Sequence, residues 1–516
     1  MIRRATDAPE RRYRAAVALL TLLASLIGIA WAMTLPYFDG PDESRHYNSI
    51  ARVVDGGGWP RPYDAVVLGV TRQALSEAGV ATDSPAVLPL ASDRSHFLGD
   101  SAHLASGRDA MVQHPPGYYL AAALVVSALG GGELRWDQAL MIMRVGSALV
   151  LAAAVPFIAG TARWATRARI AGVIGAIGVL AIPSFLIGGG YASNDVLLIL
   201  ACSATIYLLV RACSQEHPSE WLLPLAGLAY GVALFSKGLA MMLAPAVLIL
   251  ALVALHRRGY SPRSVATQLV VPLLIATTIG GWWWIRNLII LGLLQPSQYG
   301  SREGSDLASE GYDLAFFVTS FFERLNSTFW GRGTNAETAF PFWVLLGLAA
   351  VLIVIIAAAL VGGQRRWLLT VLMSYPAIIG TTLLVNAHGI YWDLGLPSRG
   401  VQARYLFSGA AVFAAVFATF ANLVANKGKM LPRGAVAALA FLPLVSSAAA
   451  MLWILPPTWA PLVDEYGVTV ADFMGVSGWV YALTGVFAIL ATLGLAALLF
   501  QAVQRPSMEA GRVRTP

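Results

Sequence analysis

The sequence predicts an all-α protein that crosses a membrane about twelve times. Hydrophobic residues make up 57% of its 516 residues and charged residues only 12%, whereas soluble domains carry about a quarter charged residues. The mean hydropathy is +0.66. Apolar runs of about 20 residues, the length that crosses a bilayer, recur along most of the chain. Lipid must therefore be the solvent for much of this protein.

Twelve apolar runs are expected to span the bilayer. They cover residues 15–35, 138–161, 170–188, 195–211, 221–236, 239–255, 267–285, 341–362, 367–386, 405–425, 434–455 and 475–502. A further apolar stretch, 117–130, is only about 14 residues long and is too short to span comfortably. We expect it to form a helix that lies in, or dips into, the membrane interface.

Basic residues are distributed unequally between the two sides of this layout. With the N-terminus inside, the inside segments carry 20 of the 35 basic residues and 5 of the 28 acidic residues, a balance of +15, against −8 outside. Cytoplasmic loops of membrane proteins carry an excess of Lys and Arg. Both termini are therefore expected in the cytoplasm. The net charge of +7 follows from this asymmetry and does not indicate a nucleic-acid partner.

Most of the extra-membrane length lies on the other side. The loops 36–137 and 286–340 are long, whereas the cytoplasmic segments between spans are short. Because function tends to concentrate in long loops, the active site is expected on the extracytoplasmic face. We divide the chain into a cytoplasmic N-terminus (1–14), a transmembrane catalytic module (15–425), and C-terminal membrane helices with a cytoplasmic tail (426–516).

A pair of acids follows the first expected span. Residues 38–47 read Phe-Asp-Gly-Pro-Asp-Glu-Ser-Arg-His-Tyr. Pro41 suits the first position of a helix, so Asp42 and Glu43 are expected in its first turn. Asp42 and His46 would then share a face. Acids are also common at helix N-termini that carry no chemistry, so the pair alone does not define a site.

Other polar groups stand at the outer ends of the expected spans. They are His114 and Tyr118 in Gln-His-Pro-Pro-Gly-Tyr-Tyr, Asp195 in Ser-Asn-Asp, Lys237 in Ser-Lys-Gly, Arg286 in Trp-Trp-Trp-Ile-Arg-Asn, Arg332 in Phe-Trp-Gly-Arg-Gly, and Arg404 and Tyr405 in Gln-Ala-Arg-Tyr. Each alone fits an interfacial anchor. Four cations at one depth, facing a carboxylate pair, instead indicate a site, because ionisable groups in a membrane usually mark one.

Together these motifs resemble a bacterial family of multi-spanning membrane proteins defined as a domain of unknown function. That family is similar to the C-type (GT-C) superfamily of glycosyltransferases, which includes protein O-mannosyltransferases and the aminoarabinose transferase of lipid A. The resemblance covers about residues 15–425, and Pro-Asp-Glu and His-Pro-Pro-x-Tyr-Tyr are its most specific parts. It implies a GT-C-like fold with a large first extracytoplasmic loop that contains juxtamembrane helices.

The resemblance also implies a reaction. Such enzymes move a sugar from a polyprenyl-phosphate carrier to an envelope acceptor outside the cytoplasm, here at a bacterial inner membrane. An acid of the first loop serves as general base, which by position is Asp42 or its neighbour Glu43. Substrate would be bound by His46, His114, Tyr118, Asp195, Lys237, Arg286, Arg332, Arg404 and Tyr405. The implied partners are the lipid-linked donor, a glycan, glycolipid or protein acceptor, and membrane lipids.

Physical chemistry agrees with this reading. A lipid phosphate that loses its sugar gains negative charge, which Arg and Lys at the headgroup level would stabilise. The attacking hydroxyl must lose a proton, which a carboxylate can accept. No glycine-rich nucleotide-phosphate loop occurs in the cytoplasmic segments of the sequence. This fits a lipid-linked donor better than a nucleotide sugar.

A spaced group of acids and histidines in the first loop is an alternative metal site. On a helix its four members would share one face and offer ligands suited to Zn²⁺ or Mn²⁺. Gly99 weakens the expectation of a helix there, and a solvated polar loop explains the same residues. We therefore expect no cofactor, with a divalent metal as the less favoured alternative. The four residues are Asp93, His96, Asp100 and His103.

Two other functions compete with glycosyl transfer. One is a transporter or flippase for a lipid-linked sugar or polymer, which would carry ionisable groups near the midplane and paired broken helices. Here the charges stand at the outer boundary, and alternating access does not need long outer loops. The other is a non-catalytic scaffold in envelope assembly, against which the retained Asp42 and the four cations speak.

Overall fold

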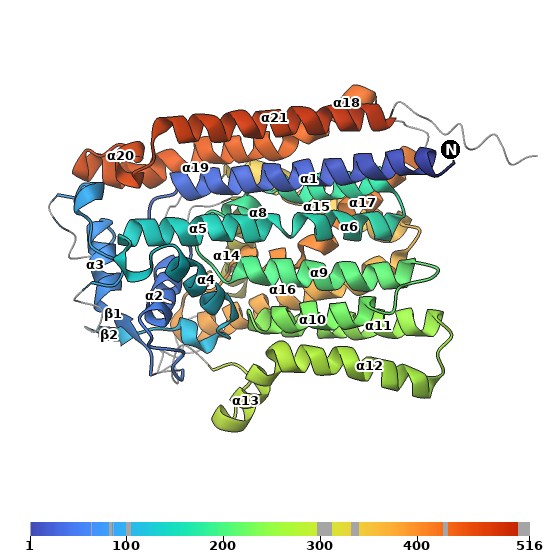
Figure 1. Ribbon diagram of the computed structural model, residues 1–516, viewed down its shortest axis with the longest axis horizontal. Helices are drawn as coiled ribbons and strands as arrows, with labels where there is room; N and C mark the ends of the chain where they lie inside the picture. Colours follow the sequence, from blue (N-terminus) through green and yellow to red (C-terminus); the bar gives the residue numbers. More distant parts are fainter. Residues whose placement is uncertain are drawn as a thin grey trace, which may run out of the picture.

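The computed structural model is built from long helices that run side by side along one axis of the molecule (Figure 1). The predicted all-α fold class is confirmed by these helices. Of the predicted site residues, Asp100, His103 and Arg332 lie outside the described residues. The structure describes residues 2–62, 64–81, 85, 87–99, 105–296, 312–331, 340–426 and 432–503.

The first half of the chain supplies one long N-terminal helix, a polar segment and a run of apolar helices. Its elements are α1 (Ile2–Thr34), α2 (Glu43–Val54), β1 (Val66–Leu68), α3 (Gly69–Glu77), β2 (Ala105–Arg108), α4 (Gly117–Ala128), α5 (Trp136–Ala152), α6 (Val155–Thr166), α7 (Arg169–Leu180), α8 (Pro183–Ile187), α9 (Asp195–Ser214), α10 (Leu222–Leu234) and α11 (Ala244–Arg257).

In the second half, every secondary-structure element of the described part is a helix. Its elements are α12 (Pro262–Ala276), the π-helical turn η5 (Thr277–Gly281), α13 (Trp282–Leu291), α14 (Leu314–Trp330), α15 (Phe342–Gly362), α16 (Arg366–Leu394), the 3₁₀ segment η7 (Ala403–Gly409), α17 (Ala410–Asn426), α18 (Arg433–Ala438), α19 (Leu442–Tyr466), α20 (Val470–Met474) and α21 (Gly478–Val503).

Ten helical stretches among the described residues are long and apolar enough to cross a membrane. The chain is therefore a multi-pass membrane protein, but the expected count of about twelve spans is not confirmed. The expected span 170–188 is divided into α7 and α8, because Pro183 begins α8 and has no N–H with which to continue α7. The expected span 221–236 is α10, which has only 13 residues.

A polar layer covers one end of the helical body, opposite the N-terminus (Figure 1). It contains α2, α3 and a small antiparallel pairing of β1 with β2. Helix α4 lies beside it and corresponds to the short helix expected over 117–130. The first long loop is thus a folded layer that stands on the ends of the apolar helices.

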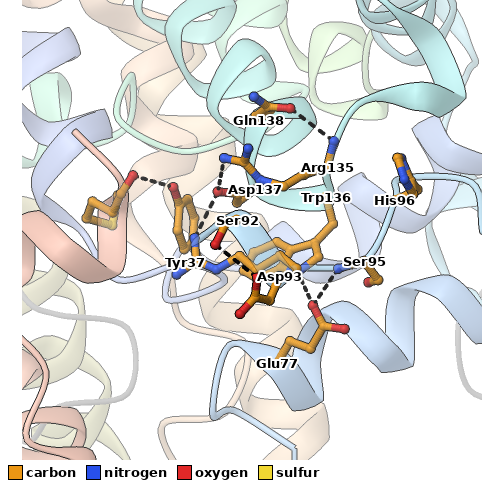
Figure 2. A network of polar contacts seen from close by, with 12 residues as sticks. Tyr37, Glu77, Ser92, Asp93, Ser95, His96, Arg135, Trp136, Asp137 and Gln138 are labelled. Atoms are coloured by element: carbon orange, nitrogen blue, oxygen red, sulfur yellow. Dashed lines mark hydrogen bonds and ion pairs between the residues drawn. The ribbon is translucent and has the colours of Figure 1, made fainter. Parts of the chain in front are cut away.

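A network of polar contacts holds this layer to the helical body (Figure 2). Glu77 of α3 accepts hydrogen bonds from Trp136 Nε1 at 2.7 Å and from the Ser95 amide at 3.0 Å. Tyr37, at the start of the loop, donates to the carbonyl oxygen of Met474 in α20 at 3.0 Å. The loop is therefore fixed to α5 and to α20, so the residues it carries stand on a rigid frame.

The C-terminal helices pack against the N-terminal one. Helix α21 lies along α1 (Figure 1), and Tyr481 donates to the carbonyl oxygen of Met33 at 2.8 Å. Trp31 of α1 donates to Ser447 Oγ of α19 at 2.8 Å. The boundary that we place between 425 and 426 remains a prediction, since these contacts cross it.

Candidate active site

The turn before α2 positions the first candidate residue. Helix α2 begins at Glu43, so the expected start at Pro41 is wrong by two residues. Asp42 precedes the helix with φ at 59°, in the left-handed region, where residues other than glycine are uncommon. The same turn packs tightly on Tyr191, since a Cβ on Gly40 would lie 2.5 Å from Tyr191 Cβ. Strained backbone of this kind often occurs at functional sites.

Four charged residues from distant segments meet at this turn, and we call them the charge cluster. Arg404 Nη2 donates to Asp42 Oδ2 at 2.7 Å, and Arg404 Nε lies 3.3 Å from Asp195 Oδ2. Lys237 Nζ donates to Asp195 Oδ1 at 2.6 Å. The cluster joins the turn before α2, the first residue of α9, the segment after α10 and the start of η7. Two of the four predicted cations, Lys237 and Arg404, and one acid of the predicted pair, Asp42, thus lie together in the structure.

The members of the charge cluster differ in exposure. The side chains of Asp195 and Lys237 are 8% exposed and that of Arg404 is 10% exposed, whereas that of Asp42 is 31% exposed. Charges at this depth are tolerated only when they are paired. With two carboxylates and two cations, the charge cluster is balanced. Asp42 is its most accessible member.

Asp42 is ionised at neutral pH. Burial by itself would raise the pKa of its carboxyl, but Arg404, with smaller contributions from His46 and Arg45, holds that pKa below its ordinary value. Arg45 Nη1 lies 3.7 Å from Asp42 Oδ1. The carboxylate can therefore accept a proton, although the bond to Arg404 makes it a weaker base than a free aspartate.

Aromatic rings line the cations. The ring centroid of Tyr405 lies 4.6 Å from Lys237 Nζ and 5.3 Å from the guanidinium carbon of Arg404. Such cation–π contacts stabilise a partly desolvated charge. Burial raises the pKa of Tyr191, whose side chain packs on the turn before α2, to about 12. Tyr191 is therefore a neutral hydrogen-bonding group at physiological pH.

Two buried histidines stand near the charge cluster. His46 Nδ1 lies 3.0 Å from Tyr119 Oη, and the two rings are stacked. Burial lowers the pKa of His46 to about 4 and that of His114 to about 3, so both imidazoles are neutral near pH 7. His114 Nδ1 has no hydrogen-bond partner within the part of the chain that the structure describes. Tyr118, also predicted to bind substrate, contacts Ser147 Oγ at 3.2 Å.

Glu43 has a different environment from its neighbour. Arg144 of α5 binds both of its carboxylate oxygens, and the backbone amide of Ala192 donates to Oε1 at 3.0 Å. Neither side chain of the Arg144–Glu43 pair is exposed. A carboxylate that is enclosed and fully bonded in this way has no free lone pair directed at an acceptor. We therefore leave Glu43 out of the proposed chemistry, although the sequence kept it as an alternative base.

Not every predicted residue joins the charge cluster. Arg286 donates to Asn287 Oδ1 at 3.0 Å and stacks on the Trp283 ring at 4.8 Å. Both partners lie in α13 itself. These contacts are those expected of an arginine that holds its helix at the membrane interface, and they do not connect Arg286 to the charge cluster. Arg332 falls outside the described residues, and its predicted role remains a prediction.

The described residues of the alternative metal site, Asp93 and His96, do not lie on one helix. Asp93 ends a short 3₁₀ turn, and His96 forms an isolated bridge with Arg135. His96 Nδ1 also lies 2.9 Å from the carbonyl oxygen of Glu133. The helix on which the four residues would have shared one face is therefore not formed in the part of this segment that the structure describes. Within the described residues, no group of three or more His, Cys, Asp or Glu side chains could hold a metal ion.

A pocket is lined mostly by residues that shortly precede Arg404 in the sequence. Its volume is about 360 Å³, and its wall reaches Gln402, two residues before Arg404. It is lined by Arg324, Leu396, Pro397, Ser398, Arg399, Gly400, Val401 and Gln402. Polar and positively charged side chains predominate, so a polar or anionic group fits its chemistry.

Sequence reasoning missed three residues of this region: Arg144, Tyr119 and Tyr191. For Arg144 a signal was available, because it is an arginine inside the expected span 138–161, and an ionisable residue within a span is rarely without a role. Tyr119 had a local signal, because it closes the His-Pro-Pro-x-Tyr-Tyr motif, whereas nothing in the sequence around Tyr191 distinguishes it. Only the fold brings Tyr119 to His46 and Tyr191 to the turn that carries Asp42.

The arrangement combines two chemical capacities. Lys237 and Arg404 offer positive charge and directed N–H donors, which suit a phosphate whose negative charge grows during a reaction. Asp42 offers an ionised and partly exposed carboxylate within bonding distance of Arg404. A base next to an anion site is what a transfer from a phosphate leaving group to a hydroxyl requires.

Comparison with known families agrees with this geometry. The model of the dolichyl-phosphate-mannose-protein mannosyltransferase family matches residues 131–296. The matched segment contains Arg144, Asp195 and Lys237. The match confirms the resemblance to the C-type glycosyltransferases that the motifs indicated. The match covers 166 of the 516 residues of the chain, which by its apolar helices is a multi-pass membrane protein. No curated protein matches the sequence.

Several solved structures are similar to this chain at low identity. ArnT from Cupriavidus metallidurans, bound to undecaprenyl phosphate, is 14% identical with a TM-score of 0.46 over 94% of this chain and 76% of that chain. The protein O-mannosyltransferase Pmt1–Pmt2 complex of S. cerevisiae, bound to the sugar donor, is 16% identical with a TM-score of 0.37 over 54% of this chain and 33% of that chain. The oligosaccharyltransferase AglB of Archaeoglobus fulgidus is 13% identical with a TM-score of 0.40 over 96% and 56%.

Proposed function

We propose that this protein transfers a sugar from a polyprenyl-phosphate carrier to a hydroxyl of an envelope acceptor, on the extracytoplasmic face of a bacterial inner membrane. The acceptor is a glycan, a glycolipid or a protein. Both termini lie in the cytoplasm, as the charge asymmetry of +15 against −8 indicates. In this orientation the charge cluster, which lies at the first residue of α9 and just after α10, faces outward.

One observation carries this proposal. A partly exposed carboxylate, Asp42, lies 2.7 Å from Arg404, which together with Lys237 supplies two cations at the end of apolar helices. Water-soluble anions do not need an apolar wall beside their binding site, but a lipid phosphate does, since its chain must lie among the helices. The family model matched by residues 131–296 is named for a lipid-phosphate sugar, which supports the same class of donor.

The reaction follows from these groups. The acceptor hydroxyl oxygen forms a bond to the anomeric carbon of the sugar, and the bond from that carbon to the phosphate oxygen breaks. The departing polyprenyl phosphate keeps the electron pair, and Lys237 and Arg404 stabilise the added negative charge. The hydroxyl proton passes to Asp42. Tyr405 holds the cations, and the neutral imidazoles of His46 and His114 offer hydrogen bonds to uncharged groups such as sugar hydroxyls.

A comparison of lipid-linked sugars tests the proposal. Cells that lack the protein should accumulate a polyprenyl-phosphate sugar, and the wild-type protein should remove it. Asp42→Asn should insert and fold, because asparagine tolerates the left-handed conformation. It cannot accept the proton, so transfer should fall by about 10²-fold or more. Asp64→Asn is the matched control, since it removes the same charge from an exposed position in the same loop.

The outcomes separate the competing functions. If no lipid-linked sugar accumulates, the proposed donor is wrong. A flippase would instead leave its lipid-linked substrate in the inner leaflet, where an impermeant oxidant of sugars does not reach it in sealed right-side-out vesicles. Normal transfer by Asp42→Asn would reduce the first-loop acid to a helix-capping role.

A further inference from the structure

All three nitrogens of the Arg404 guanidinium group face oxygen atoms of the protein, although only Nη1 and Nη2 form hydrogen bonds to them. Nη2 donates to Asp42 Oδ2 at 2.7 Å, and Nη1 donates to the carbonyl oxygen of Pro41 at 3.0 Å. Nε lies 3.3 Å from Asp195 Oδ2. Both two-pronged edges of a guanidinium group, Nε with Nη2 and Nη1 with Nη2, include Nη2. Because Nη2 already donates to Asp42, a phosphate that binds Arg404 by two prongs competes with Asp42.

The two carboxylates that hold Arg404 are not equivalent. Asp195 is 8% exposed at its side chain and also binds Lys237 at 2.6 Å. The backbone amide of Asp195, the first residue of α9, donates to Ser193 Oγ at 3.2 Å. Asp42 is 31% exposed and lies in a short turn outside the helices. Asp195 is therefore the fixed partner of Arg404, and Asp42 is the one that can be replaced.

The charge balance of the cluster also favours replacement of Asp42 by the phosphate. Two carboxylates and two cations already neutralise each other, so an incoming phosphate adds an unbalanced negative charge. Lys237 has three N–H donors and gives one of them to Asp195. It can therefore bind a phosphate oxygen without leaving its partner. A two-pronged contact between a phosphate and Arg404 instead competes with Asp42 at Nη2.

We propose that the phosphate of the lipid donor displaces Asp42 from Arg404, while Asp195 keeps Arg404 and Lys237 in place. This inference rests on the proposed function and adds a binding order to it. Before the donor arrives, Asp42 is held in an ion pair and is a poor base. Once the phosphate has taken its place, the carboxylate is free to accept the proton of the acceptor hydroxyl. Arg45, 3.7 Å from the other oxygen of Asp42, is half-exposed and stays as a weak partner.

The exchange makes the active-site acid a competitor of the donor. Removal of that competitor should improve phosphate binding even as it abolishes transfer. The binding of undecaprenyl phosphate to the purified full-length protein, measured by microscale thermophoresis in detergent, tests this. Asp42→Asn should bind about 3- to 10-fold more tightly than wild type, at the low end for a charge-assisted contact because Asp42 is partly exposed. Asp64→Asn, with the same loss of charge at an exposed site, should bind like wild type.

A second measurement separates a change in phosphate binding from a change in the stability of the variant. Thermal unfolding with and without undecaprenyl phosphate gives the stabilisation that the ligand provides. Asp42→Asn should unfold at a lower temperature than wild type without ligand, because the pair with Arg404 is lost, and should gain more from the ligand. Equal or weaker binding by Asp42→Asn, with a normal melting transition, would overturn the exchange. If wild type itself does not bind undecaprenyl phosphate, the proposed donor fails instead.

Discussion

Arg144 and Glu43 form a two-pronged ion pair inside the helical body, with Nε 2.8 Å from Oε1 and Nη2 2.7 Å from Oε2. Arg144 also donates to the carbonyl oxygens of Leu35 and Pro36, each at 2.7 Å. The pair therefore fixes the chain between α1 and α2 against α5. That chain carries Asp42, so the ion pair positions the proposed base without touching substrate.

Glu43→Gln should destabilise the protein. The substitution leaves the Arg144 guanidinium buried without a compensating charge, and breaking such a pair costs about 3–5 kcal/mol. We expect a lower yield of folded protein and a lower melting temperature in detergent. Asp64→Asn, an exposed acid of the same loop, should melt like wild type. A Glu43→Gln variant that melts normally but does not transfer sugar would make Glu43 the base in place of Asp42.

Arg404→Ala should weaken the use of the donor. The substitution removes a charge-assisted contact to the phosphate, which corresponds to about a 10- to 150-fold loss of turnover at limiting donor. Arg404→Lys should fall between wild type and alanine, because lysine keeps the charge but not the two-pronged geometry. Arg61→Ala, which removes an exposed arginine of the outer loop, is the control. Unchanged turnover in Arg404→Ala would remove this residue from the donor site.

Stability should fall as the pH is lowered from about 6.5 towards 4. Burial lowers the pKa of His46 to about 4 and of His114 to about 3, whereas an unfolded histidine titrates near 6.5. Between these values the unfolded state binds more protons, so the free energy of unfolding decreases on acidification. The slope is at most about 1.4 kcal/mol per pH unit for each histidine.

Melting temperatures at pH 7 and pH 4.5 test whether the free energy of unfolding decreases on acidification. The neighbouring charged groups are Asp42, Lys237, Arg404 and Asp195. The pKa of Asp42 is lowered, so this carboxyl titrates below the histidine window. His114→Asn should lose less stability than wild type over the same interval, because one of the two buried imidazoles no longer has to be charged. An equal loss in variant and wild type would assign the acid sensitivity to other groups.

Cysteine labelling should show the orientation of the chain. Cys202 and Cys213 are both buried, so a new surface cysteine is the main target of an impermeant maleimide. Asp64→Cys lies in the first long loop and should react in intact spheroplasts. Glu216→Cys lies between α9 and α10 and should react only after the membrane is permeabilised. The reverse pattern would invert the layout that we infer from the charge asymmetry.

The positions of the long helices could be predicted from the sequence because span length and hydrophobicity are local properties. The expected run 341–362 is α15 (Phe342–Gly362), and the expected run 475–502 is α21 (Gly478–Val503). The same reasoning failed where packing inside the protein relaxes the length requirement. Helix α10, with 13 residues, lies against α9 and α12, and its ends do not have to match the thickness of a bilayer.

By itself, the sequence determined that this protein crosses a membrane many times and which polar residues stand at the ends of its spans. Local sequence does not distinguish Asp42 from Glu43, since adjacent acids have almost the same local surroundings. The tertiary structure gives them different environments, because Glu43 pairs with Arg144, 101 residues away, and Asp42 with Arg404, 362 residues away. The left-handed backbone at Asp42 separates the two side chains. Partners so distant in the chain meet only through the packing of the helices, which no local pattern records.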